Sequence, residues 1–293
     1  MAYLGVGANY AACLNHARVV AYTTAAVPAD VPPSVIRSAS HALLKRAGLV
    51  LAGRQPGVLA LEGDRLVDEA RAIGLVFEAV LVSEEREHRA RELEQHGLEV
   101  TRVAGSLLQK KSGLRASPGI LGLCRAPHPP ALDVLGAGET ALALVVCGVA
   151  DPGNLGALAR SAEAAGASGL VCIGGGVSPW NDKALRGSMG SLLRLPVFGF
   201  DSDARARDAL SRFGFRHVCA RVRGGVAPEA AAWGGRVALW VGPETGREAF
   251  DAAGFECVTI PMSGGVESLN VTVAASIHLY FAGRERAGAG TGP

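Results

Sequence analysis

The sequence predicts an α/β protein of two units, with a parallel sheet in the second unit. Short apolar runs alternate with segments of helical spacing along most of the chain. In the second half these runs, such as "ALALVVC", are continuous, which is typical of strands buried on both faces of a parallel sheet. The stretch "HPPALDVLGAGET" carries proline and glycine between the two halves, so we expect a linker at 128–140.

Composition places the chain among globular proteins. Its 293 residues suffice for two ordinary domains, and 49% hydrophobic with 19% charged residues excludes a disordered chain. The formal net charge of +2 is compatible with a nucleic-acid enzyme whose basic residues cluster. We expect neither a signal peptide nor a membrane span, because no basic segment precedes a long apolar run and every apolar stretch has breakers.

The cysteines indicate a cytoplasmic protein without a metal. None of the six forms a C-x-x-C pair, and several lie in apolar runs, so buried reduced thiols are expected. No cluster of histidine and cysteine has metal-ligand spacing. The cysteines are Cys13, Cys124, Cys147, Cys172, Cys219 and Cys257.

The first unit is expected at 37–127, after an unassigned N-terminal extension at 1–36. "SHALLKRAGLVLAGR" predicts a helix with basic residues on its polar side. Three strand-helix pairs follow, and the unit ends with the strand "ILGLCRAP". The pairs are "GVLALEGD" with "RLVDEARAIG", "FEAVLVSEE" with "EREHRARELEQHG", and "LEVTRVAG" with "SLLQKKSGLRASPG".

The second unit, at 141–293, has six apolar runs separated mostly by helical patterns. In open α/β sheets, ligands bind beyond the carboxyl ends of the strands. Polar, glycine-containing segments follow three of the runs, and we examine these as candidate sites. The runs are "ALALVVCGV", "GLVCIGG", "LPVFGF", "HVCARV", "VALWVG" and "CVTIPM".

The first candidate segment is "VADPGNLGALARSAEAAG". Residues 151–153 predict a turn, and Asn154 is expected to cap the helix that follows. Gly156 allows close approach of another backbone. Arg160 lies six residues past Asn154 on a helix otherwise rich in alanine and leucine. A simple helix cap followed by a solvated arginine explains the same pattern, so the segment alone does not establish a site.

Two further segments are polar at a strand end. In "LWVGPETGREAF", Glu244 follows a buried strand, although a charge at a helix N-terminus explains it equally. In "IPMSGGVESLNVTVAASIHLY", the cluster "ESLN" stands where a loop becomes a helix. One helix cap needs one side chain, so the other polar groups are available to a ligand. The "GGG" at 174–176 is not a dinucleotide fingerprint, because "GGGVSP" lacks the last glycine of that pattern.

In this order, the three segments resemble the signature motifs of the SpoU class of SPOUT methyltransferases, which methylate the ribose 2'-hydroxyl of RNA. The matching stretches are "DPGNLGALARSAEAAG", "VGPETG" and "IPMSGGVESLNVTVAA", and "KALRGSMGSLLRLPV" is also similar. "IRSASHALLKRAGLVLAGR" with "LEGDRLVDEA" resembles the family's RNA-binding domain, a small fold like certain ribosomal proteins. The resemblance spans about 36–283. His41 departs from the asparagine of many members, and "SPGI" at 117–120 looks one residue short, which bears on the RNA bound.

The resemblance implies a SPOUT domain with a deep trefoil knot, whose loops would lie near 242, at 260–266 and at a helix from Ser268. It implies S-adenosylmethionine as cofactor, wrapped by the loop "MSGGVESLN", and a homodimer formed by the C-terminal domain. Main-chain groups around Gly242, Ile260 and Leu269 would hold the adenine and methionine parts. The implied cofactor-binding residues are Leu239, Val241, Gly242, Ile260, Met262, Gly265, Ser268, Leu269 and Asn270.

The resemblance also assigns catalytic roles. A ribose hydroxyl is a poor nucleophile because its pKa lies far above neutral, and a nearby cation lowers that pKa. Arg160 fits this role, whereas its high intrinsic pKa opposes a role as base, so the proton acceptor stays open. At a dimer interface Arg160 would serve the partner's cofactor. Asn154, Ser268 and Asn270 would orient groups by hydrogen bonds, and Glu244 would fix Arg160 or another site residue.

The expected substrate is RNA, with 23S ribosomal RNA first and transfer RNA as the alternative. A non-catalytic RNA-binding relative would lose Arg160 or the "SLN" cluster, and both are present. A SPOUT enzyme acting on a base nitrogen would lack the combination of "N-x-G-x-x-x-R" with "SLNV". Basic residues of the first unit are expected to contact phosphates, with an ordinary solvated surface as the alternative. They are Lys45, Arg46, Arg54, Lys110, Lys111 and Arg115.

Overall fold

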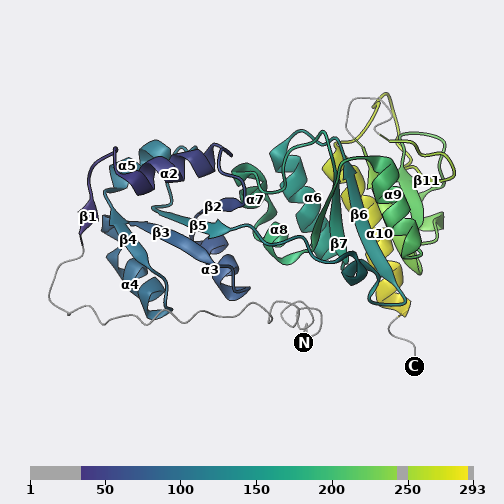
Figure 1. Ribbon diagram of the computed structural model, residues 1–293. Helices are drawn as coiled ribbons and strands as arrows, with labels where there is room; N and C mark the ends of the chain where they lie inside the picture. The colour runs from purple at the N-terminus through teal and green to yellow at the C-terminus, as the bar shows by residue number, and fades with distance from the viewer. Residues whose placement is uncertain (1–33, 243–249, 290–293) are drawn as a thin grey trace.

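The computed structural model describes residues 34–242 and 250–289, so Glu244 and Cys13 lie outside the described residues. The chain folds into two sheets with their own helices, and the two units lie side by side (Figure 1). Every strand and helix that the sequence predicts in the first unit is present. No described helix is long and apolar enough to cross a membrane.

The first unit has a five-stranded sheet with the order β1-β4-β3-β5-β2. The first three of these strands are parallel, and β5 runs antiparallel to both of its neighbours. The elements are β1 (Val35–Ile36), α2 (Ala42–Leu51), β2 (Val58–Glu62), α3 (Asp64–Ala72), β3 (Phe77–Ser83), η1 (Glu84–Arg86), α4 (Glu87–Gln95), β4 (Val100–Val103), α5 (Gly105–Lys111) and β5 (Ile120–Arg125).

Helices cover both faces of this sheet. Side chains of α2 and α5 share one apolar cluster, and side chains of α3 and α4 share another on the opposite face (Figure 1). The imidazole of His41 caps α2, because its Nδ1 accepts a hydrogen bond from the Leu43 amide at 3.3 Å. The histidine that departs from the family pattern therefore serves as a helix cap.

The second unit has a six-stranded parallel sheet with the order β11-β9-β10-β6-β7-β8. Its elements are η2 (Leu132–Gly136), β6 (Ala141–Cys147), α6 (Pro152–Ala164), β7 (Gly169–Ile173), α7 (Asp182–Ser188), α8 (Ser191–Arg194), β8 (Val197–Phe200), α9 (Asp203–Arg212), β9 (Arg216–Ala220), η3 (Pro228–Ala230), β10 (Arg236–Val241), β11 (Glu256–Val258) and α10 (Val271–Ala289). The expected linker at 128–140 includes η2, whose Leu135 is buried in the core of this unit.

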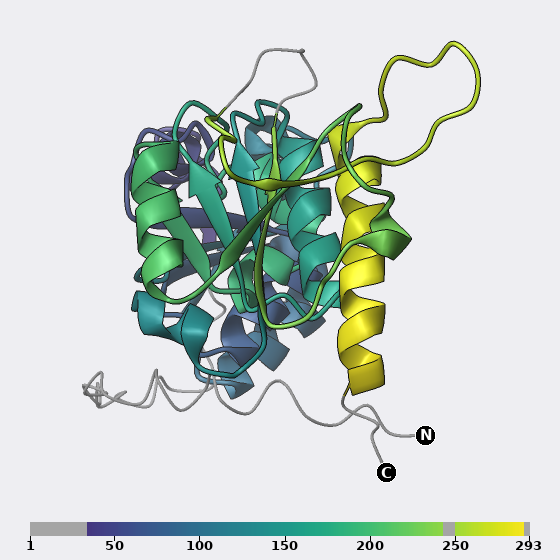
Figure 2. The same ribbon diagram turned by 90° about the vertical axis from the view of Figure 1, so that its right-hand side faces the viewer.

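The second sheet is buried on both faces, as its continuous apolar strands predict. All seven residues of β6 are buried, and they alternate between two apolar clusters. One cluster includes residues of α6 and α10, and the other includes residues of α9. Figure 2 shows α9 on one side of the sheet and α6 with α10 on the other. The sheet therefore holds α6 and α10 next to each other.

Helix α6 also packs closely on α7. A Cβ atom at Gly156 would lie 2.5 Å from the carbonyl oxygen of Ala184 and 2.7 Å from the amide nitrogen of Ser188. The glycine is therefore required for this contact, as the sequence predicts. The five described cysteines are free thiols, and four of them lie on strands of the second sheet. Cys124, Cys147 and Cys219 are buried, and Cys172 and Cys257 are half-buried.

Candidate active site

The three candidate segments leave the carboxyl edge of the second sheet. Strands β6 and β10 are neighbours, with Val146 opposite Val241, so the first and second segments begin side by side. The third segment follows β11, and it leads into α10 (Figure 2). Since α10 packs beside α6, the first and third segments meet where these two helices begin.

Helix α6 begins with a proline and an aspartate cap. The Asp151 carboxylate accepts a hydrogen bond from the Asn154 amide at 2.8 Å, and Pro152 occupies the first helical position, where its missing N–H costs nothing. The expectation that Asn154 caps the helix was therefore wrong. Asn154 lies inside the first turn, and its side chain is released to contact α10.

The side chains of Asn154 and Asn270 meet at this point. The amide nitrogen of Asn270 donates to Asn154 Oδ1 at 3.2 Å. The oxygen of Asn270 accepts from the backbone amides of Thr272 and Val273, at 2.8 and 3.4 Å, and thereby caps α10. Helix α10 therefore begins at Val271, later than the expected Ser268. The structure brings two predicted site residues together across the sequence.

Three hydroxyl groups form further contacts between α10 and α6. Thr272 Oγ1 donates to the carbonyl oxygen of Asn154 at 3.3 Å, and the hydroxyls of Ser161 and Ser276 are 2.7 Å apart. Sequence reasoning missed Thr272. The feature of the sequence that could have identified Thr272 is a hydroxyl in the first turn of a helix that is otherwise mainly apolar. These contacts set the position of α6, and hence of Arg160, relative to the loop before α10.

Arg160 is exposed on α6 and forms no ion pair with a residue in the described ranges 34–242 and 250–289. At about 100° per residue, a side chain six positions from Asn154 points about 120° away around the helix. Within one chain, Arg160 and the pair formed by Asn154 and Asn270 therefore face different directions. Its positive charge is available to an anionic group that approaches α6 from outside.

The loop at 260–269 has the donors and acceptors that S-adenosylmethionine requires. Ile260, Met262 and Leu269 are half-buried, and the other residues of the loop are exposed. Among described residues, no backbone group of this loop pairs with another backbone group. Backbone N–H and C=O groups can bind an adenine edge, an ammonium group or a carboxylate. Gly264 has a φ of +84°, which favours glycine. The loop therefore fits the cofactor.

The remaining predicted cofactor residues differ in what they present. Leu239 and Val241 lie on β10 with side chains buried in the core, so only their main-chain groups face a ligand at the strand end. Gly242 follows the end of β10 directly. Ser268 is exposed. The space beside Gly265 is open, because a Cβ atom at that position would meet nothing within 4 Å.

The predicted RNA-binding residues gather mainly around α2 and α5. Lys45 and Lys110 are exposed, and the side chain of Lys111 packs against Gly48 of α2. Arg46 instead forms an ion pair with Glu78, which leaves less of its charge for phosphate. Arg54 and Arg115 are exposed on loops.

Comparison with known proteins gives a consistent set of relatives. The model of the SpoU rRNA Methylase family matches residues 141–280. The 23S rRNA (guanosine-2'-O-)-methyltransferase RlmB of Vibrio parahaemolyticus is 34% identical over 166 residues, which are 53% of this chain and 63% of that protein. RlmB of Xanthomonas axonopodis pv. citri is 32% identical over 235 residues, which are 73% of this chain and 90% of that protein.

A solved structure with the same fold contains the cofactor. The crystal structure of the SpoU methyltransferase AviRb from Streptomyces viridochromogenes, in complex with AdoMet, superposes with a TM-score of 0.76. The two chains are 26% identical, and the superposition covers 84% of this chain and 98% of AviRb. The likeness therefore includes both units of the fold.

Proposed function

The chain belongs to the SpoU rRNA methylase family, and from this membership we propose that it methylates a ribose 2'-hydroxyl of RNA with S-adenosylmethionine as methyl donor. The substrate class that we propose is 23S ribosomal RNA, on which both RlmB relatives act. The supporting observation is the 3.2 Å hydrogen bond between Asn270 and Asn154, which joins the first and third family motifs at the carboxyl edge of the sheet. Transfer RNA is the second candidate.

The cofactor would be held by the loop at 260–269 together with Gly242. The N–H and C=O groups of the loop, which pair with no other backbone group in the described part of the chain, would bind its polar edges, and the hydroxyl of Ser268 is exposed beside them. When bound, S-adenosylmethionine supplies a methyl group on a sulfonium, whose leaving group is a neutral thioether. The residues of the chain therefore need to activate the nucleophile rather than the leaving group.

Arg160 is the residue that we assign to this activation. A guanidinium cation lowers the pKa of a nearby hydroxyl and binds the adjacent phosphate. Asn154 and Asn270 orient the loop and the nucleotide through their hydrogen bonds. The proton acceptor stays open. Glu244, which is expected to fix Arg160 or another site residue, lies outside the described residues.

We also propose a homodimer through the second unit, with Arg160 serving the partner's site. Helix α10 has an exposed stripe that includes Val273 and Tyr280, which are 48% and 62% exposed and lie two turns apart. Apolar side chains aligned in this way favour contact with another protein surface. The direction of Arg160, away from Asn154 of its own chain, supports a role in trans. Light scattering of Tyr280→Arg should give a monomer, and an unchanged dimer would exclude this surface.

The family fold includes a trefoil knot, and we propose that this chain has it. The return of α10 onto α6, after β11 has been placed at the far edge of the sheet, supports the proposal. We assign RNA binding to the first unit, at 37–127, and methyl transfer to the second, at 141–293. We further propose that the protein acts in the cytoplasm.

Nucleoside mass spectrometry tests the proposed function. The wild-type protein, labelled S-adenosylmethionine and deproteinised 23S ribosomal RNA should yield a labelled 2'-O-methylnucleoside. Arg160→Ala should lower the rate about 100-fold or more, because it removes charge stabilisation in the transition state, with cofactor affinity nearly unchanged. Arg212→Ala, an exposed arginine of α9, is the matched control. Label on transfer RNA alone would support the second candidate. No label on either RNA would refute the proposed methyltransferase activity.

A further inference from the structure

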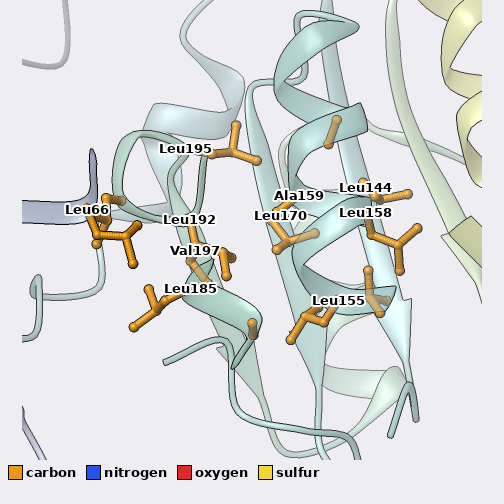
Figure 3. Close-up of a cluster of buried hydrophobic side chains, with 14 of the residues drawn as sticks. Leu66, Leu144, Leu155, Leu158, Ala159, Leu170, Leu185, Leu192, Leu195 and Val197 are labelled. Atoms are coloured by element: carbon orange, nitrogen blue, oxygen red, sulfur yellow. The ribbon is translucent and has the colours of Figure 1, made fainter. Parts of the chain in front are cut away.

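One continuous apolar cluster contains residues of both units. Leu66 of α3 belongs to the same cluster of buried side chains as Leu185 of α7 and Leu192 of α8. Figure 3 shows these leucines facing one another across the boundary between the units. A linker that merely tethered two domains would leave these surfaces exposed to water. Burial of apolar area instead favours one docked arrangement.

Two ion pairs cross the same boundary. Arg186 of α7 contacts Glu62 of β2 at 3.2 Å, and the Glu62 side chain is only 4% exposed. Arg194, at the end of α8, contacts Glu69 of α3 at 2.7 Å. Removing Arg186 would leave the buried charge of Glu62 uncompensated, so this pair disfavours other arrangements more than it adds stability.

Arg194 also holds α6. Its Nε and Nη2 atoms bind the two carboxylate oxygens of Glu163, at 2.7 and 2.8 Å, in a parallel fork. Burial acts to raise the pKa of Glu163, but hydrogen bonds led by that from Arg194 outweigh it and keep the pKa below its ordinary value. Glu163 is therefore an anion, and it lies three residues beyond Arg160 on the same helix. One guanidinium thus joins the first unit to the helix that carries Arg160.

The backbone between α7 and α8 is shaped for this contact. Gly190 has a φ of +94°, and a Cβ atom there would lie 2.6 Å from Arg194 Nη1 and 3.0 Å from Glu69 Cγ. Met189 has a φ of 53°, which is uncommon for a residue other than glycine. Its carbonyl oxygen accepts a hydrogen bond from Arg65 Nε of α3 at 3.1 Å. The turn is therefore held in an unfavourable conformation where it meets the first unit.

We propose that Arg194 is a positioning residue, which fixes the first unit against α6 so that the fold sets the distance from bound RNA to Arg160. This inference rests on the proposed function, because it assumes that the first unit binds RNA. A fixed arrangement removes the entropic cost of ordering two tethered units around each RNA molecule. It also restricts which nucleotide reaches the methyl donor once the basic residues of α2 and α5 hold the RNA.

The test variant is Glu69→Lys, which opposes Arg194 with a like charge and leaves its fork to Glu163 in place. Glu99→Lys is the matched control. Glu99 is exposed, and the substitution makes the same change in net charge within the same unit. The full-length protein is compared by small-angle X-ray scattering and by single-turnover methylation with saturating 23S ribosomal RNA. A third variant, Glu69→Lys with Arg194→Glu and Glu163→Lys, restores the network with every sign reversed.

We expect Glu69→Lys to broaden the distribution of interatomic distances and to slow single turnover about tenfold or more relative to Glu99→Lys, since small misplacements are costly in rate. Affinities for RNA and for S-adenosylmethionine should match those of the control. The sign-reversed variant should recover the narrow distribution. Control-like scattering and rate in Glu69→Lys would overturn the proposal, as would a folded sign-reversed variant whose distance distribution stays broad. Scattering does not require activity, so a wild-type protein that methylates no RNA would refute the proposed function while still testing the docking.

Discussion

The side-chain amide of Asn270 donates to the side-chain oxygen of Asn154 at 3.2 Å, and the two residues are 116 positions apart in the sequence. The same Asn270 caps α10 through its oxygen. One side chain therefore fixes the start of α10 and joins it to α6. These two tasks use different atoms, so substitutions can separate them.

We predict that Asn270→Ala loses both tasks and that Asn270→Ser loses only one. Serine retains a helix-capping oxygen, whereas alanine should lower the free energy of unfolding by about 1 kcal/mol. Both variants lack the amide that binds Asn154, so both should slow methyl transfer by about tenfold. Urea unfolding and single-turnover rates measure the two effects. If the serine variant keeps the wild-type rate, the contact with Asn154 has no part in the reaction.

Gly264 and Gly265 should respond differently to valine. Gly264 has a positive φ, so Gly264→Val should strain the loop by about 1–3 kcal/mol and lower the melting temperature. Gly265 is not in that region, and a Cβ atom there meets no neighbour within 4 Å. Gly265→Val should therefore keep its stability and raise the Kd for S-adenosylmethionine at least about tenfold, or about 1.4 kcal/mol. Calorimetric titration decides, and wild-type affinity in both variants would show that this loop does not wrap the cofactor.

Two histidines, the buried His278 and the half-buried His217, should make stability depend on pH. Burial lowers the pKa of His278 to about 4, and burial with the nearby charge of Arg207 lowers that of His217 to about 4. The unfolded chain binds these protons near the ordinary pKa of about 6.5, whereas the folded chain does not. The free energy of unfolding that these neutral histidines contribute is therefore fully present above pH 6.5 and is lost as the pH drops toward 4.

Replacing His278 should flatten this dependence. His278 is 1% exposed, and its contribution to the loss should reach roughly 2 kcal/mol at pH 4.5. We expect His278→Gln to reduce the difference in unfolding free energy between pH 7 and pH 4.5, while the exposed control His96→Gln leaves it unchanged. Urea unfolding at both pH values measures it. Equal pH dependence in the two variants would contradict the assignment.

Neighbouring basic residues on α2 should differ in their contribution to RNA binding. Lys45 is exposed, whereas Arg46 is paired with Glu78. Neutralising a phosphate contact reduces the slope of log affinity against log salt by about 0.7–0.9. Lys45→Gln should show this change, and Arg46→Gln should show less of it. Filter binding at several salt concentrations compares them, and identical slopes for Lys45→Gln and wild type would place the RNA elsewhere.

Local patterns predicted the strands because burial on both faces leaves a continuous apolar run, as in β6. Helix starts were harder to place. Asp151 and Asn154 are both good caps, and the choice depends on Pro152 at the first helical position. Ser268 and Asn270 pose the same ambiguity, which the contact of Asn270 with Asn154 resolves. The expected strand "CVTIPM" shortens to β11 because it pairs with β9 over only three residues.

Contacts between distant segments could not be predicted in this way. Glu69 and Arg194 form an ion pair between two helices. In the sequence, each of these charges is explained equally well by a solvated helix surface. The direction of Arg160 relative to Asn154 follows from their spacing on a helix, but only once the start of α6 is known. The resemblance to a family identified the motifs, and the fold showed that the first and third motifs meet at Asn154 and Asn270.

The central place of β10 has a consequence for how the protein folds. This strand is the last but one in the sequence, yet it lies between β9 and β6. The second sheet is therefore incomplete until β10 has inserted between two strands that precede it in the sequence. Topologies dominated by such non-local pairing fold slowly. The candidate site, which needs α6 and α10 side by side, therefore depends on contacts between distant parts of the chain and cannot form from any one local segment.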